Sequence, residues 1–267
     1  MRCFRQKNNG FTLIELITAM VILGVLAVGV SSFLQFGSRI YLETNDRDQL
    51  IASARFAVER LNREIRHALP NSPRLIGNNN QCIEFRPIKA AAIYTDIPLS
   101  PLPASSTIKV IRFDDSQFSN NLAVIIYPLT ADDAYFPSNK ISNIDTNNPA
   151  FDHSASVKEW PITLASPMQF IIGSPTKRLY FIDAPVSYCI EGNNLNRYQG
   201  YVNYRADEVP NISAALMAEY LDNTNASGFQ VNSASQRRAG NVLVTLNFKK
   251  NDEQVSFNNE IQVPNVP

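Results

Sequence analysis

An apolar stretch near the N-terminus, Phe11–Phe36, constrains this 267-residue chain more than any other feature, and Glu15 is its only charged residue. As a helix, its 26 residues would extend about 39 Å at 1.5 Å per residue, enough to cross a ~30 Å hydrocarbon core. A short leader with Arg2, Arg5 and Lys7 precedes it. This positive leader predicts a cytoplasmic N-terminus, with the bulk of the chain on the opposite side of the membrane.

The junction between the leader and the apolar stretch, Gly10-Phe11, has the wrong order for a secretory signal peptide. Such a peptide is cleaved after an apolar core of roughly 7–15 residues, whereas the candidate cleavage site here comes first, so the apolar segment would be retained. The basic leader, the Gly-Phe junction, Glu15 and the retained helix together resemble the class III signal of type IV pilins and pseudopilins. The resemblance implies that a prepilin peptidase cleaves between Gly10 and Phe11 and that Phe11 is then N-methylated.

Glu15 is a carboxylate within an apolar span, where a charge is costly and is expected to be functional. The resemblance implies that Glu15 pairs with the N-terminal amine of a neighbouring subunit and sets the axial register of assembly. The alternative is a solvated carboxylate at headgroup depth. Gly24 and Gly29 lower helix propensity and indicate either close helix packing or a soft point. Many major pilins have a proline where this chain has Ser32, which favours a minor subunit.

The helix is predicted to continue after the membrane span, because apolar residues recur at three- and four-residue steps on one face until Pro70. These residues are Leu50, Ala54, Ala57, Val58, Leu61, Ile65, Ala68 and Leu69. The charged side chains fall mostly elsewhere and indicate a solvated face, with an arginine-rich binding patch as the alternative. We therefore expect a cleaved leader at 1–10, a spanning half at 11–36, an amphipathic half at 37–69 and a globular head at 70–267.

The head is predicted to be rich in β-strands, because its apolar pattern changes to a period of two. The expected strands are Gln81–Arg86, Thr107–Phe113, Leu122–Tyr127, Met168–Ile172, Arg178–Ile182, Val186–Ile190, Tyr198–Tyr204, Asn241–Phe248 and Gln254–Val263. Two hairpins are expected, one joining Leu179–Ile182 to Val186–Ile190 and one joining the last two strands. A helix is expected at Ile212–Leu221 with Asn211 as its N-cap. The fold class is α+β, pilin-like, with the long helix packed on a mostly antiparallel sheet.

Two cysteines, Cys82 and Cys189, remain once the leader with Cys3 is removed, and in an exported domain they predict a disulfide. Two buried free thiols are the alternative. No metal site is expected, because His67 and His153 are in no ligand spacing. Loss of the leader's three basic residues leaves 21 basic against 24 acidic residues, a net charge of −3. This balance does not indicate a nucleic-acid partner.

Motifs for catalysis or cofactor binding are absent from the sequence, so neither an enzyme nor a cofactor is expected. The acidic pairs Asp114-Asp115 and Asp132-Asp133 lack the spacing of a calcium loop and are interpreted as turns. Aromatic side chains that suit either cross-strand packing or stacking on a sugar or DNA base are Trp160, Tyr198, Tyr201 and Tyr204.

The segments Arg55–Arg66, Ala68–Ser72 and Val186–Ile190 resemble the branch of minor subunits that contains PilW and J-like pseudopilins. The resemblance implies a minor pilin of a mannose-sensitive haemagglutinin-type pilus that primes or caps the filament near its tip and supports adhesion. Implied partners are other major and minor pilins through the N-terminal helix, the prepilin peptidase and the inner-membrane assembly platform. The head would be periplasmic first and then exposed on the pilus at the cell surface.

Two alternative functions remain at this stage. One is a minor pseudopilin of type II secretion, which shares the N-terminal motif. The other is a tip-located module that binds a glycan or DNA through two predicted surface loops, Ala91–Ser106 and Thr130–Ser166.

Overall fold

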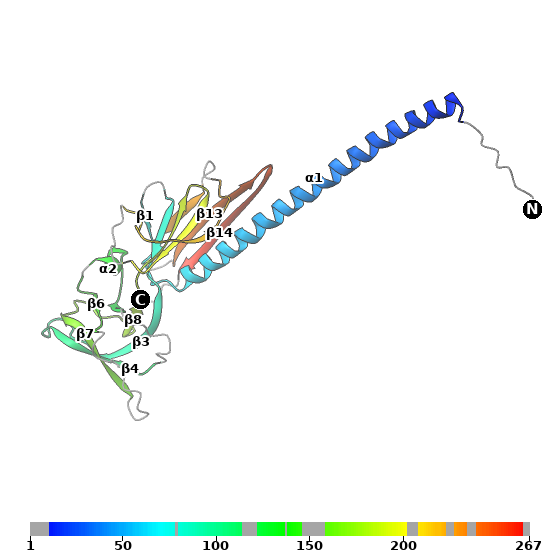
Figure 1. The fold of residues 1–267 in the computed structure, drawn as a ribbon. Coiled ribbons are helices and arrows are strands. Elements are labelled where there is room, and N and C mark those ends of the chain that lie inside the picture. The colour runs from blue at the N-terminus through cyan, green and yellow to red at the C-terminus, as the bar shows by residue number, and fades with distance from the viewer. Residues whose placement is uncertain are drawn as a thin grey trace, which may run out of the picture.

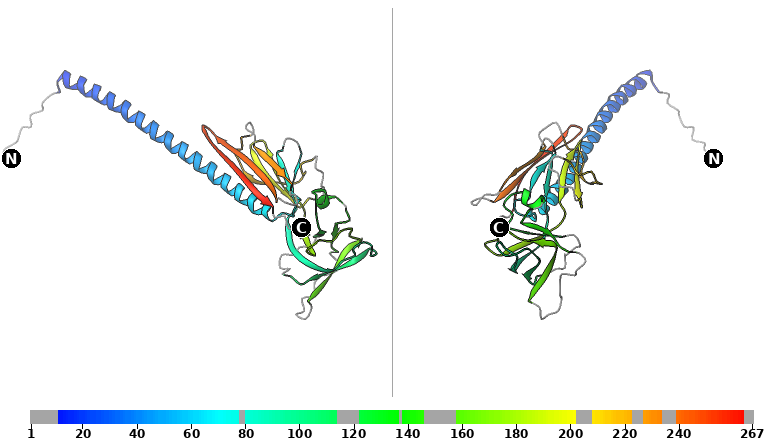
Figure 2. Two further views of the ribbon diagram at one scale, coloured as in Figure 1. Left: turned by 180° about the vertical axis from the view of Figure 1, so that it is seen from behind. Right: turned by 90° about the vertical axis from the view of Figure 1, so that its left-hand side faces the viewer.

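A long helix, α1 (Leu13–Arg66), carries a two-lobed β-rich head at its C-terminal end in the computed structural model (Figure 1). The structure describes residues 11–77, 80–113, 122–136, 138–145, 158–201, 208–222, 227–233 and 239–263. The 54 residues of α1 extend about 81 Å, so most of the helix projects beyond the head (Figure 2). This arrangement confirms the predicted α+β fold, with a long N-terminal helix packed on antiparallel sheets.

The first lobe consists of the C-terminal half of α1 and two antiparallel sheets. One sheet has the order β1-β2-β9-β10-β11 and the other has the order β12-β13-β14. Their bounds are β1 Arg74–Ile76, β2 Cys82–Phe85, β9 Val186–Glu191, β10 Asn194–Gln199, β11 Ala215–Ala218, β12 Gly228–Asn232, β13 Gly240–Lys250 and β14 Glu253–Val263. The predicted apolar face of α1 is buried against them, with fully buried side chains at Leu50, Ala54, Ala57, Leu61 and Ile65.

The second lobe is an insertion between β2 and β9, and we call it the inserted lobe. It contains β3 Ile88–Asp96, β4 Ser105–Ile111, β5 Ala123–Ile126, α2 Asp132–Tyr135, β6 Ile141–Asn143, β7 Glu159–Met168 and β8 Arg178–Ile182. Its sheet has the order β6-β5-β8-β3-β4-β7. The two outer strands meet through a bridge between Ile144 and Leu164, which curls the sheet toward closure around its own core of Trp160, Phe170 and Phe181.

The two lobes meet at a neck formed by β2 and β9, which pair in antiparallel register from Cys82↔Cys189 to Phe85↔Val186. A third apolar cluster covers the outer face of β5 and β8 with Leu69 and Tyr135. Leu69 also donates its backbone N–H to the Arg86 carbonyl, at 2.8 Å. The chain has therefore already left α1 and joined the sheet before Pro70, which places the helix end three residues earlier than the predicted boundary.

The predicted hairpin of Leu179–Ile182 with Val186–Ile190 is wrong, because the two strands lie in different sheets. β8 pairs with β3 and β5, whereas β9 pairs with β2 and β10. Each strand is buried on both faces and needs neighbours on both sides, so the short link 183–185 crosses between lobes instead of folding back. The other predicted hairpin is confirmed, since β13 and β14 pair without interruption from Gly240↔Val263 to Lys250↔Glu253.

The predicted helix Ile212–Leu221 is also wrong, because Ala215–Ala218 forms the edge strand β11 beside β10. Tertiary pairing at the sheet edge overrides the helix propensity of this alanine- and leucine-containing segment. The predicted loops are partly wrong, because β3 extends to Asp96, and the second loop contains α2, β6 and most of β7.

Two strand predictions are misplaced. β7 ends at Met168, where the strand Met168–Ile172 was expected to begin. β10 covers Asn194–Gln199, so the predicted strand Tyr198–Tyr204 shares only its first two residues with it, and residues 202–204 lie outside the described residues.

Candidate assembly site

The N-terminus of α1 is closed by a capping box between Thr12 and Glu15. Thr12 has the extended backbone of an N-cap, and its Oγ1 accepts a hydrogen bond from the Glu15 N–H at 3.4 Å. The Glu15 carboxylate in turn accepts from the Thr12 N–H at 3.3 Å and from its hydroxyl at 3.1 Å. In the isolated chain, Glu15 is therefore held by its own helix. Phe11 lies immediately before the cap with an 83% exposed side chain, and Gly10 lies outside the described residues.

The apolar half of α1 is not packed against any other described part of this chain. None of residues 11–42 is buried, and the exposed side chains there are mostly large and apolar. Within the described part of the chain, α1 is the one helix long and apolar enough to cross a membrane. Such a surface requires lipid or other apolar helices around it.

The stalk glycines have no steric role inside this chain. A Cβ atom added to Gly24, Gly29 or Gly37 would meet nothing within 4 Å. A shallow groove of about 460 Å³ lies at Gly37, between Phe33 and Tyr41. The open faces of these glycines are therefore available to a neighbouring helix, which favours packing between chains over packing within one.

Counting from the N-terminus of α1, the head first contacts the helix through the tip of the β13–β14 hairpin. Lys250 Nζ lies 2.9 Å from Asp46 Oδ1 and also donates to Gln49, and Asn251 Nδ2 donates to Asp46 Oδ2 at 2.7 Å. Hydrogen bonds from Lys250 and Asn251 lower the pKa of Asp46, and the hydrogen bond to Asp46 raises the pKa of Lys250. The helix is thus attached to the head from Asp46 onward, and the segment before it projects freely.

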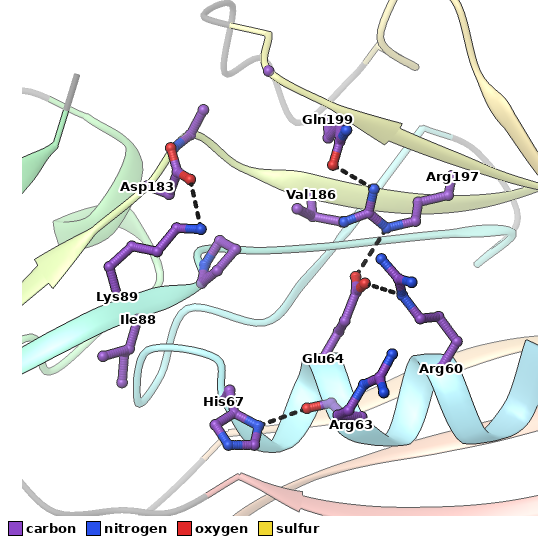
Figure 3. A pocket seen from close by; sticks show the side chains of 13 residues that line it. Arg60, Arg63, Glu64, His67, Ile88, Lys89, Asp183, Val186, Arg197 and Gln199 are labelled. Carbon is purple, nitrogen blue, oxygen red and sulfur yellow. Dashed lines mark hydrogen bonds and ion pairs between the residues drawn. The ribbon is translucent and has the colours of Figure 1, made fainter. Parts of the chain in front are cut away.

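A second anchor lies near the end of α1, around Glu64. Its carboxylate accepts from Arg197 Nε at 2.9 Å and from Arg60 (Figure 3). It also accepts from the Tyr188 hydroxyl at 3.0 Å. Burial alone would raise the pKa of Glu64, but the hydrogen bonds from Arg197 and Arg60 outweigh it and lower the pKa. Burial raises the pKa of Tyr188 above its usual range. Glu64 therefore ties α1 to β9 and β10 as an ionised group.

Cys82 and Cys189 form a disulfide, as the sequence predicts. They are opposite residues on β2 and β9, and both are buried beside Ile76, Tyr198 and Tyr201. The cross-link closes the neck of the inserted lobe, so the 107-residue separation of the cysteines contains that whole lobe.

The other candidate residues serve the structure of the head. Asp133 accepts from the Leu129 N–H at 2.8 Å and from Lys140 Nζ at 2.7 Å, so it closes a turn. Trp160 is buried in the inserted lobe, and Tyr198 and Tyr201 are buried in the first lobe, which removes all three from any stacking surface. Burial and the Glu191 carboxylate raise the pKa of Tyr198 to about 12.

The remaining candidate residues from the sequence are His67, His153, Tyr204 and the pair Asp114-Asp115. His67 is the C-cap of α1, with its Nδ1 2.8 Å from the Arg63 carbonyl oxygen. Across the described ranges, no three His, Cys, Asp or Glu side chains come together as metal ligands. Tyr204, His153 and the pair Asp114-Asp115 lie outside the described residues.

The two anchors of α1 were missed at the sequence level. The partners at the hairpin tip are more than 200 residues apart, and Glu64 is 133 residues from Arg197. Lys250 is one of four charged residues at a predicted hairpin turn, 249–253, and nothing in the sequence marks its partner. The one signal in the sequence was the position of Glu64 beside the apolar face of α1. A carboxylate that is buried there is usually paired with a cation.

Comparison with known proteins supports a pilin-like N-terminus. Residues 5–31 match the family described as the prokaryotic N-terminal methylation motif, which covers the end of the leader and the apolar stretch as far as Ser31. The match supports membership of the pilin and pseudopilin superfamily, whose proteins are structural subunits rather than enzymes. Together with the exposed apolar half of α1, the match indicates processing by a prepilin peptidase and anchoring in a membrane. No curated protein and no solved structure matched the chain.

Proposed function

We infer that this protein is a minor pilin-like subunit that assembles into a type IV pilus through its N-terminal helix. The observation that carries the proposal is the methylation motif, because it is continuous with an apolar helix that has no cover within the chain. The head grips this helix only from Asp46 onward, which leaves the whole apolar half free for other subunits. Residues 1–10 are then a cleaved leader, 11–36 the spanning half of the stalk, 37–69 its amphipathic half and 70–267 the head.

The role of Glu15 follows from a change of partner on processing. In the intact chain the nitrogen of Phe11 is part of a peptide bond and carries no charge, and among the described residues the Glu15 carboxylate accepts from the backbone and hydroxyl of Thr12. Cleavage after Gly10 would give Phe11 a cationic amine, and N-methylation leaves that amine basic. In a low-dielectric helix bundle, a carboxylate and an ammonium attract strongly enough to favour one alignment of neighbouring chains. Glu15 would then set the register between subunits.

The assembly role of Glu15 can be separated from its capping role with two variants. Thr12→Ala removes the cap hydroxyl and keeps the carboxylate, whereas Glu15→Gln keeps a capping side chain and removes the charge. We expect Glu15→Gln to abolish incorporation into sheared pili and Thr12→Ala to retain it, with equal amounts of both variants in the membrane. Retained incorporation of Glu15→Gln together with loss in Thr12→Ala would show that the helix cap matters and the charge does not.

Processing is tested by intact and peptide mass spectrometry of protein extracted from membranes with and without the prepilin peptidase. The expected product lacks Met1–Gly10, carries a methyl group on Phe11 and keeps the disulfide. A chain that retains its leader in the presence of the peptidase would overturn the proposal and leave a simple membrane-anchored protein.

The filament system is the finer part of this proposal. Resemblance in Arg55–Arg66 and around Cys189 favours a subunit similar to MshO of the mannose-sensitive haemagglutinin pilus, with a role in priming or capping the tip. Deletion should then remove surface pili. Loss of protein secretion with intact pili would instead assign the chain to a type II secretion pseudopilus.

A tip-located adhesive module is a second candidate, and the inserted lobe favours it. This lobe has its own core and lies at the far end of the head from the free stalk (Figure 1). Filament assembly through α1 does not require such a lobe. Excising residues 86–185 should leave pilus assembly intact and abolish attachment, whereas loss of the pili themselves would make the lobe a structural part of assembly.

A further inference from the structure

A cleft of about 800 Å³ lies where the end of α1 meets β10 and the neck of the inserted lobe (Figure 3). Arg60 and Arg63 line it from α1, and Arg197 lines it from β10. Lys89 lines it from β3, and Asp183 lines it from the link between β8 and β9. Three parts of the chain that are distant in sequence thus direct four cationic side chains at one cavity.

The two carboxylates in the cleft are already occupied by donors from its own walls. Glu64 accepts from Arg60 and Arg197, as described above. Asp183 lies 3.2 Å from Lys89 Nζ and accepts the Ala184 N–H at 2.7 Å. Four Arg and Lys side chains against two carboxylates leave an excess of two positive charges in the cleft.

Arg63 is the uncommitted cation. Its side chain is exposed, and among the described residues its guanidinium has no hydrogen-bond or ion-pair partner. A guanidinium presents five N–H donors in a planar fork that matches a carboxylate. Lys89 forms an ion pair with Asp183, and its ammonium has further N–H donors available for a ligand. The cleft thus contains unused donors for an anionic ligand.

We propose that this cleft binds an acidic peptide segment of another protein, with Arg63 and Lys89 as the carboxylate-binding residues. Its volume is in the range of about 300–1,000 Å³ that is usual for ligand clefts, which suits several residues of a peptide better than a single inorganic ion. A lipid headgroup is a poor candidate, because Arg60 follows Phe36 by 24 residues, or about 36 Å of helix beyond the apolar span. The inference goes beyond the proposed function and does not depend on the filament system.

The test is a binding measurement on the full chain in a non-ionic detergent. The probe is a fluorescent hexaglutamate peptide followed by anisotropy, with hexaglutamine as the neutral control. The variants are Arg63→Glu and Arg55→Glu, because Arg55 is an exposed arginine on the same helix that does not line the cleft. The single tryptophan, Trp160, provides a fluorescence check that each variant keeps the buried core of the inserted lobe.

We expect saturable binding of hexaglutamate that Arg63→Glu weakens by about tenfold to a hundredfold, the usual effect of losing a charge-assisted hydrogen bond. Arg55→Glu should leave the affinity within about twofold, and high salt should weaken binding to the unaltered protein. Equal losses in the two variants would show general attraction to a basic helix and overturn the proposal. So would an absence of saturable binding, or displacement of the peptide by inorganic phosphate at concentrations that match the peptide's own affinity.

Discussion

Replacing both Cys82 and Cys189 with alanine should destabilise the head mainly through the unfolded chain. The disulfide closes a loop that spans a 107-residue separation, and the chain-entropy relation gives about 4.8 kcal/mol of stabilisation at 25 °C for a loop of that length. Loss of two buried sulfur atoms adds a packing cost. Making the same double substitution in a shortened chain, which serves as a second background, separates the loop-entropy contribution from the packing contribution.

The inserted lobe makes this second background possible, because its two ends leave the first lobe side by side. Phe85 and Val186 are register partners, so a two-residue Asn-Gly turn can join them in place of residues 86–185. The disulfide in the shortened chain closes a loop of about ten residues, for which the same relation gives about 2.7 kcal/mol. The sulfur atoms keep their neighbours Ile76, Tyr198 and Tyr201, which all belong to the first lobe.

The expected result is a difference between backgrounds. The double alanine substitution should cost about 2.1 kcal/mol more in the full chain than in the shortened chain, because the packing loss cancels. Urea denaturation in non-ionic detergent, followed by far-UV circular dichroism, measures both costs. Equal costs in the two backgrounds would refute the loop-entropy argument and assign the stabilisation to local packing of the sulfur atoms.

Three further predictions concern the attachment of α1. Leu61→Ala should lower the free energy of unfolding by about 2–5 kcal/mol in urea denaturation, because Leu61 is fully buried. Glu64→Gln should cost about 1.5–3 kcal/mol at pH 7 by weakening a charge-assisted contact to Arg197. The pKa of Glu64 is below its ordinary value of 4.5, so this difference between Glu64→Gln and the unaltered chain should be present above that pH and shrink as the pH falls through the lowered value. Lys250→Ala should speed amide exchange in α1 around Asp46 without lowering the global melting temperature.

The features that the sequence predicts well are local. The α1 face from Leu50 to Ile65 is set by helical periodicity, and it is buried as expected. β14 alternates between half-buried and exposed residues along most of its length, so its hairpin with β13 is evident from the period-two pattern. Cys82 and Cys189 stand out because they are the two cysteines that follow the predicted leader, and they form the expected disulfide.

The features that the sequence misses depend on distant partners. β8 and β9 are buried at successive positions, so they carry no apolar–polar alternation to show the sheet to which each belongs. Residues 183–185 are short enough for a hairpin loop, yet they join two lobes. The cleft is equally hidden, because Arg63, Lys89 and Arg197 come from three separate segments. Helix and strand content can thus be inferred from periodicity, whereas the division into lobes and the basic cleft require pairing information.

The neck also decides how the head would bear mechanical load. A pull on the inserted lobe along the neck is transmitted through β2 and β9 together, and their cross-link at Cys82–Cys189 keeps the two strands from separating. The hydrogen bonds that hold β2 to β1 and β9 to β10 are perpendicular to the strands, so such a load shears each ladder as a unit instead of opening it bond by bond. Tension on the outer lobe would therefore reach α1 through a reinforced sheet, which suits the proposed role, in which neighbouring subunits would hold the stalk.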